Sequence, residues 1–308
     1  MSYTEINYPS ANGENDVCAY IWAPPAGVTP RGVVQIAHGM AEHALRYATF
    51  AQFLTEHGFV ACANDHVGHG RSANGQFGYM GEHNGHKTLA KDAYRLFCLI
   101  KKQYPDLPYV LLGHDMGAMI ARYIGSLWGL EFDGLILSGT GKMLDGSPSA
   151  FVSVLGKLRG LQQETKMFAR INQRAVNRTF KNEDARYGWR TRDMKEIERM
   201  KADPLIGFTF TYAGVRDVLK LGEIVSSHAW AERMPKDLPV YLFSGLNDVV
   251  GEYGRGVLKV YERLVDADCD NVEIKLYEDA RHDMLFELNK QEVYTDVLRW
   301  LEETVLKA

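Results

Sequence analysis

Three side chains that could carry out hydrolysis follow one another along the chain in the order Asp115, Asp248 and His282. Asp115 is the central residue of Gly113-x-Asp115-x-Gly117, which lies between an apolar run and a helical pattern. Glycines on both sides permit a tight strand-to-helix turn that presents the central side chain above a sheet. Asp248 and His282 each come shortly after a predicted strand, at the end where parallel sheets place functional groups. This order predicts a catalytic triad in which Asp248 orients His282, and His282 acts as base and then as acid.

Two backbone groups are suited to stabilise a negatively charged oxygen. An apolar run ends in His38-Gly39, and a turn there would direct the backbone N–H of Met40 toward the reacting centre. The N–H of Met116 opens the helix that follows Asp115, and a helix N-terminus attracts negative charge. We therefore expect the N–H groups of Met40 and Met116 to form an oxyanion hole.

The elements that must position these residues are short apolar runs that alternate with helical patterns, which predicts a mainly parallel sheet flanked by helices. The predicted strands are residues 17–22, 32–38, 59–65, 109–113, 133–138, 240–245 and 272–277. Beyond residue 142 the alternation stops, and the helical segments are residues 151–161, 167–180, 193–201 and 208–219. The sequence therefore predicts an α/β core of residues 1–142 and 235–308, interrupted by a helical lid of residues 143–234.

Composition and charge exclude several classes of protein. The 308 residues include 35 Lys+Arg and 39 Asp+Glu, so no basic excess would attract nucleic acid. No apolar run reaches the ~18 residues of a membrane span, and the N-terminus lacks the basic and apolar regions of a secretory signal. The four cysteines are scattered, without the spacing of a metal site or a disulfide framework. We expect a cytoplasmic protein without a bound metal, and the composition does not indicate an oligomeric state.

Several motifs that together span most of the chain have a recognisable pattern. They are His38-Gly39-Met40-Ala41-Glu42-His43, Arg46-Tyr47, Asn64-Asp65-His66-Val67-Gly68-His69-Gly70-Arg71-Ser72, Gly113-His114-x-Met116-Gly117, Ser244-Gly-x-x-Asp248 and His282. They resemble the monoacylglycerol lipase and lysophospholipase branch of the α/β-hydrolase superfamily, which includes serine aminopeptidase-like sequences. The resemblance implies an α/β-hydrolase fold and hydrolysis of a carboxylic ester, such as a monoacylglycerol or a lysophospholipid. It implies a small-molecule ester or lipid as substrate and no cofactor.

The resemblance breaks at position 115, where the family has serine and this chain has aspartate. A carboxylate that attacks an ester carbonyl must expel an alkoxide and leave an anhydride. That intermediate should collapse backwards, because carboxylate is by far the better leaving group. Asp115 would instead form an ion pair with protonated His282 and disable it as a base at neutral pH. We therefore expect the chain as given to be inactive or impaired as an esterase.

Two other interpretations remain open at this point. Asp115 could attack saturated carbon, as in epoxide hydrolases and haloalkane dehalogenases, or the chain could be a non-catalytic binder that keeps the pocket. Epoxide hydrolases and haloalkane dehalogenases typically carry Trp directly after the nucleophile, where this chain has Met116. Epoxide hydrolases also tend to have Pro two residues after His-Gly, where this chain has Ala41. Tyr187 and Tyr212 could supply the acidic hydroxyls that epoxide opening needs. The sequence favours the ester-hydrolase scaffold.

The predicted lid carries apolar residues at helical spacing, which could line a substrate pocket over the triad. The candidate pocket residues are His38, Phe151, Leu155, Phe208 and Tyr212. Residues 151–201 also hold 13 Lys/Arg and 6 Asp/Glu. This excess predicts weak contact between the basic lid and an anionic lipid surface. The cations concerned include Arg159, Lys166, Arg170, Arg174 and Arg178.

Overall fold

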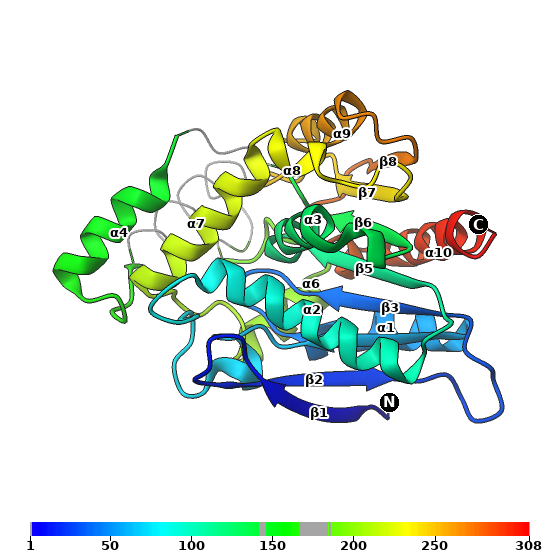
Figure 1. Ribbon diagram of the computed structural model, residues 1–308, viewed down its shortest axis with the longest axis horizontal. Helices are drawn as coiled ribbons and strands as arrows, with labels where there is room; N and C mark the ends of the chain where they lie inside the picture. The colour runs from blue at the N-terminus through cyan, green and yellow to red at the C-terminus, as the bar shows by residue number, and fades with distance from the viewer. Residues whose placement is uncertain (1, 142–145, 167–183, 185, 308) are drawn as a thin grey trace.

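An eight-stranded sheet with the strand order β1-β2-β4-β3-β5-β6-β7-β8 forms the centre of the molecule (Figure 1). The computed structural model describes residues 2–141, 146–166, 184 and 186–307. Neighbouring strands from β4 to β8 are parallel, whereas β2 is antiparallel to both β4 and β1. This confirms the predicted mainly parallel sheet. The strands are β1 (Thr4–Pro9), β2 (Asp16–Trp22), β3 (Gly32–Ala37), β4 (Phe59–Asn64), β5 (Tyr109–His114), β6 (Gly134–Ser138), β7 (Val240–Gly245) and β8 (Val272–Tyr277).

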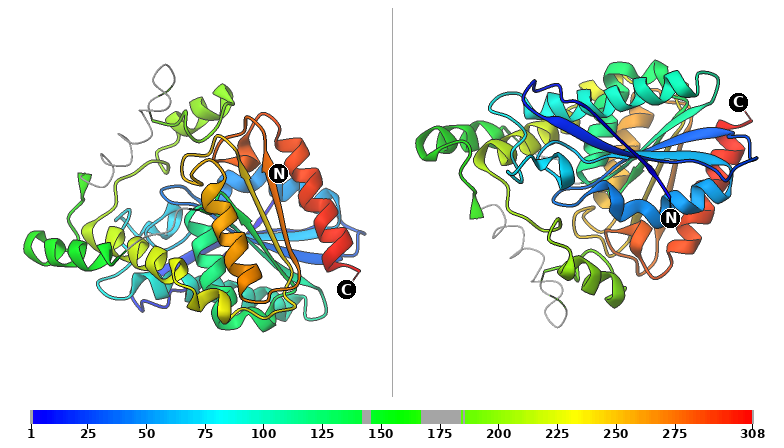
Figure 2. Two further views of the ribbon diagram at one scale, coloured as in Figure 1. Left: turned by 90° about the horizontal axis from the view of Figure 1, so that it is seen from above. Right: turned by 90° about the horizontal axis from the view of Figure 1, so that it is seen from below.

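Helices cover both faces of the sheet (Figure 2). Side chains of a strand point alternately to the two faces. Val110 and Leu112 of β5 accordingly join the apolar core that includes residues of α1 and α10, whereas Leu111 joins the core that includes residues of α2, α3 and α9. Strands buried on both faces are near-continuously apolar, which explains why the sequence pattern located the central strands well. These helices are α1 (Ala48–Glu56), α2 (Gly85–Gln103), α3 (Met116–Trp128), α9 (Arg255–Asp266) and α10 (Lys290–Trp300).

Between β6 and β7, the described residues contain helices and no strand of the sheet. α7 packs against α3 and α2, and α4 packs against α7 and extends beyond the edge of the sheet (Figure 1). The predicted helix at 208–219 starts later, at Tyr212, because the Thr211 hydroxyl caps it by accepting the Gly214 N–H at 3.1 Å. The predicted helix at 167–180 lies outside the described residues. The helices here are α4 (Pro148–Arg159), α6 (Met194–Ala202), α7 (Tyr212–Ser226) and α8 (Ala229–Glu232).

The described residues also bear on the membrane and redox expectations. No helix among them is long and apolar enough to cross a membrane. The four cysteines are free thiols; Cys18, Cys62 and Cys269 are buried, and Cys98 is partly buried. A cytoplasmic location stays a prediction.

Candidate active site

Asp115 occupies a strained turn between β5 and α3. Its backbone has φ 53° and ψ −115°, a conformation that L-residues rarely adopt. Both flanking glycines are sterically required. A Cβ on Gly117 would lie 1.9 Å from the carbonyl oxygen of Ala37, and a Cβ on Gly113 would lie 2.2 Å from that of Gly117. The turn therefore packs directly against the end of β3, which fixes the position of the Asp115 side chain.

The loops after β7 and β8 bring the other two predicted residues to the same place. His282 and Asp248 are completely buried, and 3.0 Å separates His282 Nδ1 from Asp248 Oδ2. Asp248 is held in turn by the Ser244 hydroxyl, which donates to Oδ2 at 2.8 Å, and by the Val250 N–H, which donates to Oδ1 at 2.8 Å. The other ring nitrogen, His282 Nε2, lies 3.6 Å from Asp115 Oδ1. Asp115, Asp248 and His282 thus form one continuous chain of polar groups.

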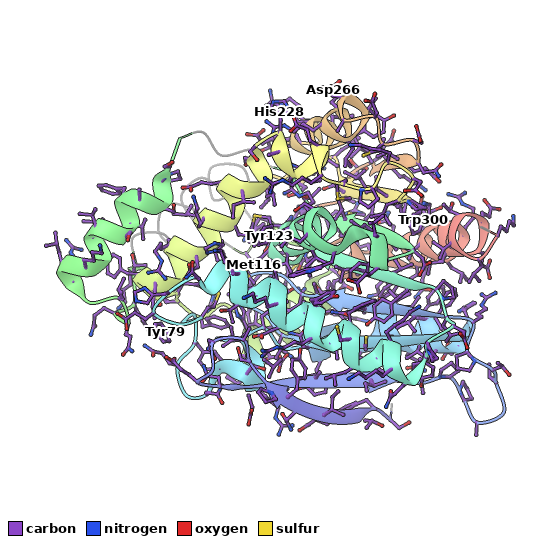
Figure 3. All side chains as sticks on the ribbon, viewed as in Figure 1. Tyr79, Met116, Tyr123, His228, Asp266 and Trp300 are labelled. Atoms are coloured by element: carbon purple, nitrogen blue, oxygen red, sulfur yellow. The ribbon has the colours of Figure 1, made fainter. Side chains whose placement is uncertain are left out.

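The turn after β3 supplies a donor to the other side of the Asp115 carboxylate. The Met40 N–H donates to Asp115 Oδ2 at 2.8 Å. Met116 is the first residue of α3, and first-turn N–H groups have no partner within the helix. Figure 3 shows Met116 at the end of α3 that faces α7. One carboxylate oxygen of Asp115 therefore accepts the N–H of Met40, one of the two predicted oxyanion donors, and the other oxygen faces the histidine. The oxyanion hole itself stays a prediction.

The electrostatics favour a charged pair at this point. Burial lowers the pKa of His282, but the carboxylates of Asp248 and Asp115 outweigh it and hold that pKa well above its ordinary value. Burial raises the pKa of Asp115, but the neighbouring His282 and the Met40 N–H outweigh it, and the pKa falls below its ordinary value. An imidazolium next to a carboxylate follows. An imidazolium has no lone pair with which to accept a proton.

Comparison with known proteins places the chain in a family. The family model described as serine aminopeptidase, S33, matches residues 28–289. The chain belongs to this α/β-hydrolase family. It is 30% identical over 289 residues to the monoacylglycerol lipase of Mycolicibacterium smegmatis, covering 91% of each chain. It is 28% identical over 304 residues to the monoglyceride lipase homolog of Monkeypox virus, covering 94% of this chain and 96% of the relative. A highly thermostable carboxyl esterase from Bacillus coagulans, solved in complex with glycerol, superimposes with a TM-score of 0.91 at 30% identity and covers 99% of both chains.

His38 of this α/β-hydrolase lies beneath the turn that carries Met40. Its ring has no exposed surface, and its nitrogens bond backbone groups: Nδ1 to the Gly39 carbonyl at 2.8 Å, and Nε2 to the His66 N–H at 3.0 Å. Burial, together with the neighbouring histidines His66 and His69, holds the pKa of His38 well below its ordinary value. A neutral ring that donates from Nδ1 and accepts at Nε2 satisfies both contacts. His38 thus supports the turn.

The predicted lid residues take different places in the hydrolase. Phe208 lines a cavity of about 550 Å³ together with Phe77 and Gln163. Tyr212 is buried, and its hydroxyl accepts a hydrogen bond from Arg159 Nη1 at 3.0 Å, so this cation is not simply a solvated surface charge.

Two other predicted pocket residues lie on α4. Leu155 is partly buried against the apolar core, whereas Phe151 is 63% exposed. Of the predicted lid cations, Arg170, Arg174 and Arg178 lie outside the described residues. The pocket-lining role of these positions stays a prediction.

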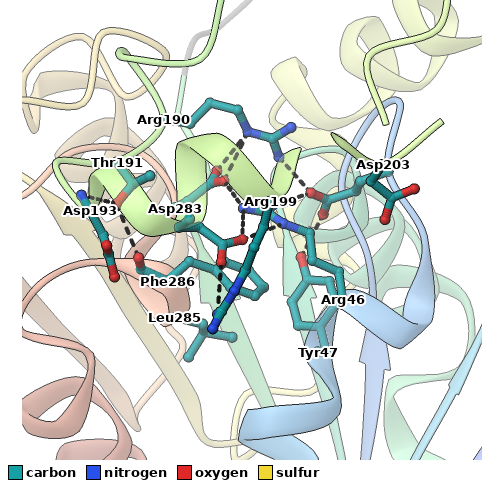
Figure 4. Close-up of polar contacts among 12 residues, drawn as sticks. Arg46, Tyr47, Arg190, Thr191, Asp193, Arg199, Asp203, Asp283, Leu285 and Phe286 are labelled. Atoms are coloured by element: carbon teal, nitrogen blue, oxygen red, sulfur yellow. Dashed lines mark hydrogen bonds and ion pairs between the residues drawn. The ribbon is translucent and has the colours of Figure 1, made fainter. Parts of the chain in front are cut away.

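Sequence reasoning missed a buried charge cluster beside the triad. Asp283, directly after His282, and Glu42, in the turn after β3, are both completely buried and both bond the guanidinium groups of Arg46 and Arg190 (Figure 4). The motif that contains Glu42 and Arg46 was visible as a family pattern, but nothing in the sequence indicated that Arg190 would join them from a distant helical region.

The described residues include one group with metal-like geometry, made of His114, His282 and Asp283, whose ligand atoms lie within 4.8 Å of one another. Each is already engaged. Asp283 bonds two guanidinium groups, His282 bonds Asp248 through Nδ1, and His114 Nε2 lies 3.2 Å from Asp283 Oδ1. A cation would have to displace these partners beside two arginines. The arrangement suits proton transfer and charge pairing better than metal binding.

Proposed function

We propose that the chain is a carboxylic-ester hydrolase scaffold of the monoacylglycerol lipase type, in which Asp115 at the nucleophile position blocks the serine mechanism. One observation carries the proposal: the Asp115 carboxylate binds the Met40 N–H through one oxygen and faces His282 with the other. The contact with the Met40 N–H is the one that the oxyanion of a tetrahedral acyl intermediate needs. The contact with His282 is the one that an activated serine needs.

With serine at position 115, each residue has a role that follows from its place. His282 takes the proton of the hydroxyl as the oxygen attacks the ester carbonyl carbon, and Asp248 stabilises the imidazolium that forms. The N–H groups of Met40 and Met116 bind the oxyanion. His282 then gives its proton to the departing alcohol, and a water molecule, activated by the same histidine, releases the fatty acid from the acyl-enzyme.

With aspartate at position 115, the first step fails for two reasons. The histidine is held as an imidazolium by two carboxylates, and the oxyanion position is filled by a side chain of the protein itself. The site therefore resembles a hydrolase trapped with a permanent anion in its oxyanion hole.

Monoacylglycerols and lysophospholipids are the substrate class that we propose for the scaffold. Full-length relatives are named monoacylglycerol and monoglyceride lipases, and the carboxyl esterase with a TM-score of 0.91 was solved with glycerol bound.

The outer face of α4 supports contact with a lipid surface. Phe151, Val154 and Leu158 lie at helical spacing and are 63%, 59% and 79% exposed. Lys157 belongs to the last turn of the same helix. Exposed apolar residues next to cations are typical of helices that lie on an anionic membrane surface. We expect binding to vesicles that contain phosphatidylglycerol, and loss of that binding in Leu158→Glu.

The test compares the chain with its Asp115→Ser variant on p-nitrophenyl esters of graded chain length and on a monoacylglycerol. We expect turnover only from Asp115→Ser. Asp115→Asn is the matched control, because it removes the carboxylate charge without supplying a hydroxyl nucleophile. Turnover of esters by the unchanged chain would contradict the anhydride argument.

The same assay decides between the other two interpretations. An epoxide and a haloalkane belong in the panel, since turnover of either by the unchanged chain would replace acyl transfer by displacement at saturated carbon. If folded Asp115→Ser acts on none of the esters, the hydrolase proposal is wrong and a binding role takes its place.

A further inference from the structure

Residues 186–192, here called the strap, belong to the region between β6 and β7. They contact the loop that carries His282, here called the histidine loop. The Arg190 carbonyl accepts the Asp283 N–H at 2.6 Å, and the Thr191 hydroxyl donates to the Phe286 carbonyl at 3.0 Å. The Trp189 ring lies over the His282 ring, with 5.2 Å between centroids. The strap is thus bonded to the histidine loop by both backbone and side chains.

The guanidinium group of Arg190 reaches two carboxylates on different loops. Arg190 Nε lies 2.9 Å from Asp283 Oδ2 (Figure 4). Arg190 Nη2 donates to Glu42 Oε2 at 2.5 Å. Only 5% of Arg190 is exposed, so these bonds form away from water. A planar guanidinium can bond two separate carboxylates in a fixed geometry, which the single ammonium of a lysine cannot reproduce.

Glu42 links Arg190 to the turn that contains Gly39 and Met40, here called the oxyanion turn. Its other oxygen, Oε1, accepts the Gly39 N–H at 2.6 Å and the Tyr47 hydroxyl at 2.6 Å. Gly39 precedes Met40, whose N–H binds Asp115. Held by Arg190, Glu42 therefore fixes the turn whose next peptide forms one side of the oxyanion hole.

Asp283 links Arg190 to the histidine loop and to His114. It follows His282 directly, and its Oδ1 lies 3.2 Å from Nε2 of His114, the residue before Asp115. Burial raises the pKa of Asp283, but Arg190 and then Arg46 outweigh it and hold that pKa well below its ordinary value. Arg190 and Arg46 likewise hold the pKa of Glu42 well below its ordinary value, although burial raises it. Without Arg190, Arg46 would be the one guanidinium group of this cluster left to both carboxylates.

We propose that Arg190 is a positioning residue for acyl transfer, which aligns the oxyanion turn and the histidine loop through Glu42 and Asp283. This inference rests on the proposed function. The proposal predicts that one residue from the region between β6 and β7, Arg190, contributes to catalysis through Glu42 and Asp283 without contacting the substrate.

The kinetic test uses Arg190→Gln and Arg190→Lys in the Asp115→Ser background. A small displacement of the reacting groups is costly, so we expect kcat to fall on the order of 100-fold. KM should change by less than about threefold, because substrate-binding surfaces are untouched. Arg192→Gln is the matched control: it lies on the same strap and bonds Glu287 of the same loop, but neither Glu42 nor Asp283. Its kcat should remain near that of the parent.

Chemical rescue separates positioning from general stability. In Arg190→Ala, millimolar guanidinium chloride, far below the concentrations that unfold proteins, should restore part of kcat, whereas sodium chloride should not. If Arg190→Gln does not fold, Arg190→Lys decides, since a folded lysine variant with parental kcat would overturn the proposal.

A second readout does not depend on turnover. In the unchanged chain, hydrogen exchange of the Gly39 and Met40 amides reports the oxyanion turn, because these N–H groups bond Glu42 and Asp115. Arg190→Gln should accelerate exchange at both amides at least about tenfold while leaving the amides of β5 protected. Unchanged exchange at Gly39 and Met40 would refute the positioning role, even if Asp115→Ser proves inactive and the hydrolase proposal fails separately.

Discussion

Replacing Asp115 by serine should change the acid–base behaviour of His282 by an amount that the geometry sets. His282 Nε2 lies 3.6 Å from Asp115 Oδ1. At an effective dielectric constant of about 20, two unit charges at this distance attract by about 4.6 kcal/mol. Because the Asp115 side chain is 21% exposed, solvent weakens this attraction. The remaining attraction favours the imidazolium, so we expect the pKa of His282 to fall when Asp115→Ser removes the carboxylate.

Nuclear magnetic resonance measures this directly. The Cε1 proton of His282 is followed from pH 4 upward in the chain, in Asp115→Ser and in the uncharged, near-isosteric Asp115→Asn. Both variants should titrate at lower pH than the chain. The ester hydrolysis rate of Asp115→Ser should rise with pH through the same midpoint, since the neutral imidazole is the base.

Stability provides the same information independently. The pKa of His282 is raised in the folded state. Its ion pair with Asp115 therefore stabilises the fold fully only below the pKa of an unfolded histidine, about 6.5, and this stabilisation disappears as pH rises through the folded-state pKa. The pKa of Asp115 is lowered, so its contribution is present above about 3.9 and disappears as pH falls through its folded pKa. The advantage of the chain over Asp115→Asn should therefore be largest near pH 5 to 6. Identical His282 titrations in the chain and both variants would refute the ion pair and, with it, our reason for the loss of activity.

Three further perturbations test other parts of the structure. Burial raises the pKa of Asp92 to about 6, so the free energy of unfolding should decline as pH rises from about 4 to 6. Asp92→Asn removes this charge. Measured by urea unfolding, it should stabilise the fold by up to about 3 kcal/mol at pH 7.5 and by almost nothing at pH 4. Gly117→Ala would place a Cβ 1.9 Å from the Ala37 carbonyl oxygen and should cost about 3 kcal/mol or more; wild-type stability would mean that the turn can relax. In the serine variant, Asp248→Asn should lower kcat on the order of 10⁴-fold with little change in KM, whereas an unaffected kcat would remove Asp248 from the triad.

The sequence predicted the mainly parallel sheet and the three polar residues that lie together at Asp115, because both depend on local patterns. Buried strands are continuously apolar. Glycine is required at positions 113 and 117 because a Cβ there would lie 2.2 Å and 1.9 Å, respectively, from a backbone carbonyl oxygen. β1 was missed because Thr4–Pro9 is an edge strand with mostly polar and exposed residues, which lacks the apolar signal. The start of α7 was misplaced because Phe208 continues the apolar period, while the Thr211 hydroxyl determines where the helix begins.

The charge cluster could not be predicted in this way because its members are separated by 148 residues between Glu42 and Arg190, and by 93 between Arg190 and Asp283. Each residue alone is an ordinary charged side chain of a soluble protein. Only tertiary packing places two arginines against two carboxylates in a buried site, where charges attract more strongly than at the surface. Long-range electrostatics of this kind leave no periodic signature in the sequence.

The proposed oxyanion hole provides a reason why the fold accommodates aspartate at position 115. A hydrolase site is built to stabilise negative charge that develops on an oxygen between backbone N–H groups and an imidazolium. A carboxylate at position 115 presents such a charge permanently; the Met40 N–H donates to one of its oxygens, and His282 Nε2 lies 3.6 Å from the other. The same preorganisation that would lower the barrier to acyl transfer therefore stabilises Asp115 in the ground state. The better the scaffold is as an esterase with serine, the more firmly it should hold the aspartate that prevents the reaction.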